Sequence, residues 1–336
     1  MREALFYERI GGNSVKCNLC AHRCKILESK RGICGVRENN GGMLYTLVYD
    51  RVVSRMVDPI EKKPLFHFFP GSSSYSVATV GCNFRCLNCQ NYDISQMPRD
   101  LKGKIVGEKV TPDEIVEDAR RYGCQSIAYT YTEPTIFFEL AYDTAKLAKK
   151  QGIRNVFVTN GYMTEEALKE ISPYLDAAHI DLKSFDDAFY RRVCGARLQP
   201  VLDSVRLHKE LGIWIEIVTL IIPNLNDGEA NLRKIAEFIV DVDRGIPWHV
   251  SKFYPTYKLL DQPATPVPIL RLATEIGKEA GLRYVYQGNV PGEGEDTYCY
   301  NCGELVVRRV GYQILENRIT NSSCPRCGVR VEGVWS

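Results

Sequence analysis

Eleven of the thirteen cysteines fall into three tight groups, and this clustering constrains the chain more than any other feature. The groups are Cys17/Cys20/Cys24/Cys34, Cys82/Cys86/Cys89 and Cys299/Cys302/Cys324/Cys327. Gaps of two or three residues bring several thiolates within reach of one metal centre. The sequence therefore predicts three metal sites, and only Cys124 and Cys194 stand alone.

The remaining composition is that of an ordinary globular protein. The first ten residues, MREALFYERI, lack the apolar segment of a secretory signal. The most apolar stretch, residues 213–223, is too short to span a bilayer and contains Glu216. We therefore expect a cytoplasmic protein with no membrane partner, in a compartment where structural disulfides are rare. The net charge of +2 gives no reason to expect a polyanionic partner.

Three segments are expected along the chain. Residues 1–70 hold the first cysteine group, a hairpin around residues 43–56 and an irregular connector rich in proline at 58–72. Residues 71–290 form the main domain, and residues 291–336 carry the last cysteine group after the turn-rich PGEGED.

The main domain alternates predicted strands and helices. Strands are expected at 75–80, 125–132, 153–159, 177–183, 213–221, 248–254 and 283–288. Helices are expected from Thr111 and at 136–150, 164–171, 201–211, 229–241 and 266–280. Such alternation indicates parallel βαβ units and an α/β fold. We predict a partial (β/α)6 TIM-like barrel, with a doubly wound open sheet as the alternative.

The central cysteine group has a spacing that leaves a metal atom open. GCNFRCLNCQN (81–91) gives Cys-x3-Cys-x2-Cys directly after the first predicted strand of the main domain. Structural zinc and electron-transfer clusters are normally held by four protein ligands. With three thiolates, one iron of a [4Fe-4S] cube stays free for a substrate, at the carboxyl end of the sheet where barrel active sites are built.

This spacing resembles that of the radical S-adenosylmethionine (SAM) superfamily. The resemblance implies that Cys82, Cys86 and Cys89 hold a [4Fe-4S] cluster and that SAM chelates the open iron. One electron from an external donor then breaks the sulfur–C5′ bond, and the 5′-deoxyadenosyl radical abstracts hydrogen from a substrate. One departure is Asn88, which stands where the superfamily usually has an aromatic residue.

Residues at the ends of three strands are expected to contact SAM. Glu133 in YTYTEPT resembles the acid of the superfamily's Gly-Gly-Glu element, although the glycines are replaced. Asn160, after the third strand, matches the frequent Ser/Thr-Asn-Gly. His179, Asp181 and Lys183 share one strand face, which should be the barrel interior because burying charges among helices is costly. Asp181 and Lys183 match the Asp-Leu-Lys of glycyl-radical-enzyme activases, where these residues meet SAM.

The two outer groups each offer four thiolates. Cys17, Cys20, Cys24 and Cys34 could hold structural zinc, which we take as the first choice, or an auxiliary iron–sulfur cluster, with His22 able to replace one ligand. The Cys-x2-Cys-Gly knuckles at Cys299/Cys302 and Cys324/Cys327 indicate a zinc ribbon, with rubredoxin-like iron as the competitor. Residues 298–336 hold five arginines, no lysine and three glutamates, so nucleic-acid binding is not expected.

The whole chain, from about residue 3 to 336, resembles the AmmeMemoRadiSam-system radical SAM enzymes, which are described as similar to pyruvate formate-lyase-activating enzyme. The resemblance rests on CNLCxHRC, RGICGVREN, DPIEKKPLFHFFPG, GCNFRCxxCQN, YTYTEPT, DLKSF, WHVSKFYP and the CxxCG/CPRCG pair. It implies a radical SAM enzyme whose substrate is unknown and could be a protein. The alternatives are an activase that installs a glycyl radical on a partner enzyme, and a nucleic-acid-modifying enzyme that uses the ribbon for binding.

Overall fold

The computed structural model describes residues 1–290 and 292–335, and its centre is a nine-stranded sheet. Two of these strands, β7 (Arg51–Pro59) and β9 (Glu108–Lys109), are antiparallel to their neighbours at one edge. The other seven are parallel and follow chain order: β8 (Ser73–Thr79), β10 (Ser126–Tyr129), β11 (Arg154–Thr159), β12 (Ala177–Asp181), β13 (Trp214–Ile221), β14 (Trp248–Lys252) and β15 (Val285–Gly288).

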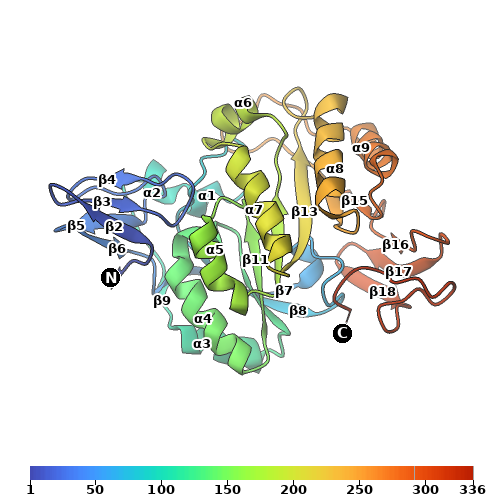
Figure 1. Ribbon diagram of the computed structural model, residues 1–336, viewed down its shortest axis with the longest axis horizontal. Coiled ribbons are helices and arrows are strands. Elements are labelled where there is room, and N and C mark those ends of the chain that lie inside the picture. Colours follow the sequence, from blue (N-terminus) through green and yellow to red (C-terminus); the bar gives the residue numbers. More distant parts are fainter. Residues whose placement is uncertain (291, 336) are drawn as a thin grey trace.

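Helices connect successive parallel strands and cover the sheet (Figure 1). The six long ones are α3 (Pro112–Arg121), α4 (Phe138–Lys150), α5 (Glu165–Ile171), α7 (Gln199–Glu210), α8 (Glu229–Asp243) and α9 (Val267–Ala280). The strand order contains no reversal, so right-handed crossovers put these helices on one face and exclude a doubly wound sheet. Strands β15 and β9 end the sheet without pairing to each other. The predicted α/β partial barrel is therefore confirmed.

Local signals in the sequence explain where the helices begin. The side chain of Thr111 accepts from the backbone of Glu114 while Glu114 accepts from Thr111, which forms a capping box before Pro112. Shorter elements are α1 (Tyr92–Ser95), α2 (Met97–Asp100), α6 (Asp187–Phe189), a π-helical turn (Tyr190–Cys194) and 3-10 turns at Ile60–Lys62, Pro134–Phe137 and Ser172–Tyr174. No helix in the described ranges has the length and apolar character needed to span a bilayer.

The hairpin expected around residues 43–56 does not form, so this prediction was wrong. β6 (Met43–Thr46) pairs with β5 (Arg37–Asn40) and β1 (Arg2–Glu3) in a small N-terminal sheet. β7 instead pairs with β8, whose backbone groups on that side would otherwise form an open sheet edge. A second small sheet contains β2 (Tyr7–Ile10), β3 (Ser14–Cys17) and β4 (Lys25–Ile26).

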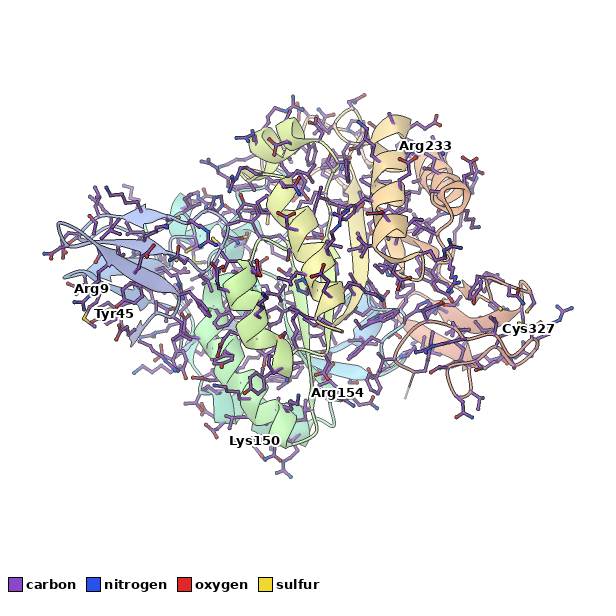
Figure 2. The ribbon with its side chains drawn as sticks, in the orientation of Figure 1. Arg9, Tyr45, Lys150, Arg154, Arg233 and Cys327 are labelled. Carbon is purple, nitrogen blue, oxygen red and sulfur yellow. The ribbon has the colours of Figure 1, made fainter. Side chains whose placement is uncertain are left out.

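A third small sheet lies at the opposite end of the molecule from the N-terminal sheets (Figure 1). It consists of β16 (Thr297–Tyr298), β17 (Leu305–Val310) and β18 (Gln313–Asn317). Cys327 lies at its outer edge, far from Arg9 and Tyr45 of the N-terminal sheets (Figure 2).

The connector between β7 and β8 is bound to the sheet through the carboxylate of Glu216 on β13. This side chain has no solvent exposure and accepts from the backbone N–H groups of Phe66 (3.0 Å) and His67 (2.7 Å). It also accepts from His249 Nε2 (2.7 Å) and Trp214 Nε1 (3.1 Å). Burial alone would raise the pKa of Glu216, but the contacts with His249 and His67 together outweigh it and lower the pKa.

The same connector also holds the C-terminal segment. His67 contacts the Tyr286 hydroxyl on β15 through Nε2 (2.5 Å) and the backbone oxygen of Glu332 through Nδ1 (2.6 Å). Phe68 and Val334 form an isolated parallel bridge. The connector that the sequence presented as irregular is therefore a buried joint between the main sheet and the C-terminal module.

Replacing Glu216 should destabilise the whole protein. Glu216→Ala leaves four donors without this acceptor, three of them buried, and we expect a loss of about 3–5 kcal/mol in the free energy of unfolding. Denaturant titration followed by circular dichroism measures it, with Glu210→Ala, an exposed glutamate at the end of α7, as the control. Equal stability of the two variants would contradict the importance of this carboxylate.

Candidate functional site

The three central cysteines lie on the loop that follows β8, at the carboxyl end of the parallel strands. Cys86 is buried, Cys82 and Cys89 are half-buried, and all three are free thiols. Gly81 begins this loop with φ +100°, and a Cβ there would lie 2.6 Å from Val36 Cγ1 and 3.0 Å from the backbone oxygen of Cys34. Only glycine permits this approach, so the N-terminal region packs directly on the cysteine loop.

Each sulfur of the central group has a specific neighbour. The backbone N–H of Phe84 donates to Cys82 Sγ (3.3 Å), and Cys89 Sγ lies 3.1 Å from Ser95 Oγ. The neighbouring thiol of Cys194 lowers the pKa of Cys86. These contacts place polar donors around the sulfurs.

The sequence indicates no partner for Cys194, but the structure places it beside the central loop. It is fully buried, and its backbone oxygen accepts from the N–H of Arg85 (2.9 Å) inside the central loop. The following Gly195 has φ +69°, and a Cβ there would lie 2.4 Å from Arg85 Nε. More than a hundred residues separate this turn from the loop, so no local pattern in the sequence indicates the contact.

The residues around these thiols fit a bound cofactor. The side-chain nitrogen of Asn83 and the side-chain oxygen of Asn88 are buried, and neither has a hydrogen-bond partner within the protein. Unpartnered buried amides are costly unless another group satisfies them. Three thiols on one loop with two unsatisfied amides match the donor set that an iron–sulfur cluster with an open iron and its ligand require.

Glu133 and Asn160 are brought together as neighbours of the central loop. Glu133 is 1% exposed, and its carboxylate accepts from the backbone N–H groups of Thr135 (3.0 Å) and Asn160 (2.8 Å) and from the Thr159 hydroxyl (2.8 Å). Asn160 Nδ2 in turn donates to Asn83 Oδ1 (2.7 Å). Because the protein itself occupies both oxygens of Glu133, this arrangement favours a role in positioning Asn160.

His179, Asp181 and Lys183 form a connected row at the end of β12. His179 Nε2 lies 3.0 Å from one oxygen of Asp181, and Lys183 Nζ donates to the other at 2.8 Å. Burial would raise the pKa of Asp181, but the Lys183 ammonium and the His179 contact outweigh it and hold the pKa below its usual range. Burial would lower the pKa of Lys183, but the Asp181 carboxylate, with a smaller contribution from Cys86, raises it above its usual value.

The sequence did not predict a further charged cluster around Asp58, because the connector was expected to be irregular. Asp58 on β7 accepts from Lys62 (2.7 Å), Lys63 (2.6 Å) and Ser76 (2.7 Å), and also from the Tyr131 hydroxyl. Burial lowers the pKa of Lys63 to about 8 despite the partner carboxylate. The backbone oxygen of Lys63 lies 2.9 Å from His179 Nδ1, so this cluster adjoins the row on β12.

The two outer cysteine groups differ in geometry. Among the described residues, only Cys299, Cys302, Cys324 and Cys327 bring three or more possible metal-binding atoms within 4.8 Å of one another. Two sulfur pairs there, Cys299–Cys327 and Cys302–Cys324, are 3.7 Å apart. Tetrahedral zinc with Zn–S bonds of about 2.3 Å requires sulfurs about 3.8 Å apart. The N-terminal four line a pocket instead.

Comparisons with known proteins show which family the chain belongs to. Residues 76–239 match the family described as Radical SAM superfamily. Uncharacterized protein MJ0808 of Methanocaldococcus jannaschii is 48% identical over 336 residues, which cover 99% of each chain. Pyruvate formate-lyase-activating enzyme of Clostridium pasteurianum is 27% identical over 198 residues, 54% of this chain and 80% of that protein.

Among solved structures, Streptococcus suis SuiB bound to S-adenosylmethionine has a TM-score of 0.52 at 13% identity, over 68% of this chain and 53% of that chain. This likeness shows the fold alone. With 48% identity over nearly all of both chains, the protein belongs to the same family as MJ0808, and its residues 76–239 make it a radical SAM enzyme.

Proposed function

We propose that Cys82, Cys86 and Cys89 hold a [4Fe-4S] cluster and that Asn160, Asp181 and Lys183 bind the SAM molecule on its open iron. The observation that supports this proposal is that three free thiols, two unsatisfied amides and a half-buried Asp–Lys pair lie at one end of the parallel sheet. Bound there, the cluster and SAM supply a one-electron cleavage that yields a 5′-deoxyadenosyl radical. An external one-electron donor supplies the electron.

The residues of the chain bind and orient SAM in this proposal. Its methionine end carries an ammonium and a carboxylate, which the paired charges of Asp181 and Lys183 complement. Asn83 Nδ2 and Asn88 Oδ1 have no partner within the protein. They can replace hydrogen bonds to water that SAM loses when it binds. Glu133 positions Asn160 by accepting a hydrogen bond from its backbone N–H. Asn83, Asn88, Glu133 and Asn160 are buried, which limits the entry of water into the site.

We propose a protein as the substrate. Relatives of this chain include proteins named Pyruvate formate-lyase-activating enzyme and 4-hydroxyphenylacetate decarboxylase activating enzyme, and both names describe action on another enzyme. An activase that removes hydrogen from a partner's backbone is the specific form of this proposal. The ribbon carries too small a net charge to favour a nucleic acid.

The cluster assignment is tested by anaerobic reconstitution with iron, sulfide and a reductant, followed by assay for 5′-deoxyadenosine from SAM. We expect Cys86→Ala to lose product formation by at least a hundredfold, because one iron loses its thiolate. Cys124→Ala is the matched control, since Cys124 is buried outside every cysteine group. Undiminished product from Cys86→Ala would overturn the ligand assignment.

The role of Lys183 is tested by SAM binding. Lys183→Met keeps the apolar stem but removes the charge paired with Asp181, and we expect SAM affinity to fall about 10–100-fold while iron content stays unchanged. Equilibrium dialysis of reconstituted protein measures the affinity. Lys209→Met on α7 is the control, and an unchanged SAM affinity in Lys183→Met would exclude a direct contact.

We further propose zinc at Cys299, Cys302, Cys324 and Cys327, which the 3.7 Å sulfur pairs support. Cys302→Ser should release this metal, because a tetrahedral site loses most of its affinity with one thiolate. Elemental analysis of wild type and variant, both purified without added metal, would show zinc lost and iron retained. Loss of iron in place of zinc would indicate the rubredoxin-like alternative.

A further inference from the structure

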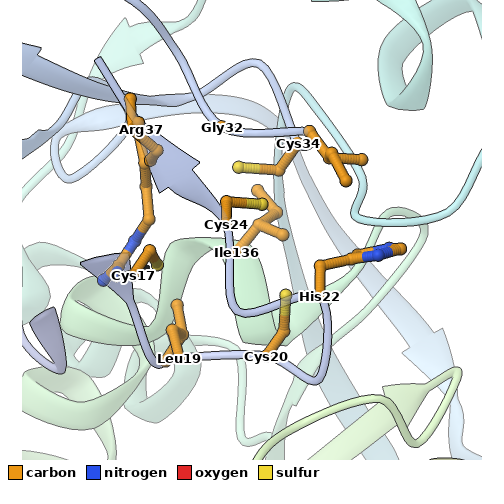
Figure 3. A pocket seen from close by; sticks show the side chains of 11 residues that line it. Cys17, Leu19, Cys20, His22, Cys24, Gly32, Cys34, Arg37 and Ile136 are labelled. Atoms are coloured by element: carbon orange, nitrogen blue, oxygen red, sulfur yellow. Dashed lines mark hydrogen bonds between the residues drawn. The ribbon is translucent and has the colours of Figure 1, made fainter. Parts of the chain in front are cut away.

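The four N-terminal cysteines surround an enclosed pocket between two loops. Cys17 ends β3, Cys20 and Cys24 lie on the turn before β4, and Cys34 lies on the loop before β5. Figure 3 shows the side chains of Cys20, Cys24 and Cys34 directed toward a common space, with Cys17 beside Arg37. Apolar side chains complete the wall: Leu19, Ile26, Ile33 and Ile136.

The distances between sulfur atoms distinguish the C-terminal cysteine group from the other two. The C-terminal four stand within 4.8 Å of one another. Among the described residues, no three of the N-terminal sulfurs come that close, and the same is true of Cys82, Cys86 and Cys89. The central group, which the radical SAM fold associates with a cluster, therefore shares the wider spacing of the N-terminal group.

From this difference we infer that Cys17, Cys20, Cys24 and Cys34 hold a second [4Fe-4S] cluster in place of the zinc ion expected from the sequence. A single metal ion draws its four thiolates to one point, at the separation seen in the C-terminal group. A four-iron cube binds each thiolate to a different metal atom, so the sulfurs stand farther apart. The N-terminal and central groups, with widely spaced sulfurs, and the C-terminal group, with closely spaced sulfurs, occur in the same structure. The sulfur spacing is therefore a property of each site.

The electrostatic setting suits an anionic metal centre. Arg37 is 1% exposed, donates to Cys17 Sγ (3.3 Å) and pairs with Glu139 of α4. Its Nε is buried without a partner in the protein. A buried guanidinium with an unsatisfied donor beside four thiolates is stabilised when those thiolates carry net negative charge on a metal.

The pocket adjoins the central cysteine loop. His22 does not serve as a ligand, because its ring points away from the sulfurs (Figure 3) and Nε2 lies 2.9 Å from the backbone oxygen of Asn83. Arg99 donates to the backbone oxygen of Ile33 (2.8 Å) in the pocket wall and to that of Phe84 (3.2 Å) in the central loop. The inferred second cluster therefore occupies a loop in contact with the SAM site.

Metal analysis of the unaltered protein gives the first test. After anaerobic reconstitution with iron and sulfide, followed by desalting, two clusters and one zinc predict about eight irons and one zinc per chain. A zinc ion at the N-terminal site predicts about four irons and two zincs. The second result, in protein expressed with both metals supplied, would overturn the inference.

The second test isolates the N-terminal site from the SAM chemistry. The triple variant Cys82→Ala/Cys86→Ala/Cys89→Ala should retain half the iron of wild type and, once reduced, a cluster signal in electron paramagnetic resonance that added SAM leaves unchanged. Cys20→Ser/Cys24→Ser should also retain half the iron, with a signal that SAM perturbs. Cys124→Ser controls for the loss of any buried thiol.

These variants also separate the two proposals. If the triple variant holds no iron although its circular dichroism matches wild type, the second cluster is refuted. The proposal of a SAM site at the central cysteines is not affected by that result. If added SAM does not change the electron paramagnetic resonance signal of Cys20→Ser/Cys24→Ser, the proposed SAM site is contradicted. The inference of a second cluster is not affected by that result. Zinc content should stay equal in all four proteins, and zinc lost from Cys20→Ser/Cys24→Ser would assign zinc to the N-terminal pocket.

Discussion

The carboxylate of Glu216 holds together parts of the chain that the sequence keeps far apart. A buried charge must be surrounded by donors, and here the donors come from the connector, from β13 itself and from β14. The connector in turn carries His67 to β15 and to the last residues of the chain. It also carries Lys63, whose backbone oxygen meets His179 in the row that leads to Asp181. The connector thus links this joint to the row of residues on β12 that we propose binds SAM.

The candidate site residues lie together at the carboxyl ends of the parallel strands because of the topology of the sheet. Parallel strands place all their carboxyl ends at one edge, so the loops after β8, β10, β11 and β12 converge although their residues are distant in the chain. Asn83, Glu133 and Asn160 at this edge are buried, so their dipoles and charge are poorly screened by water. The N-terminal region packs on the same loop, through Gly81 and His22. Its cysteine pocket is therefore part of the neighbourhood of the site.

Much of the site and fold could be predicted from local pattern. Each parallel strand lies within two or three residues of its expected range, because the period of hydrophobicity and the capping residues are local properties. The hairpin at 43–56 failed since strand pairing is decided by which edge is open, and the edge of β8 is formed by residues farther along the chain. The contact between Cys86 and Cys194 was missed for the same reason.

The amino-acid sequence determined the identity and number of the thiolates in each group, the alternation of strand and helix, and the shared face of His179, Asp181 and Lys183. These follow from spacing along the chain, which folding does not change. Tertiary structure decided how far apart the sulfurs stand, which oxygens of Glu133 are already occupied, and that the connector is buried. Such properties depend on distances between segments remote in sequence, and only packing against the sheet sets those distances.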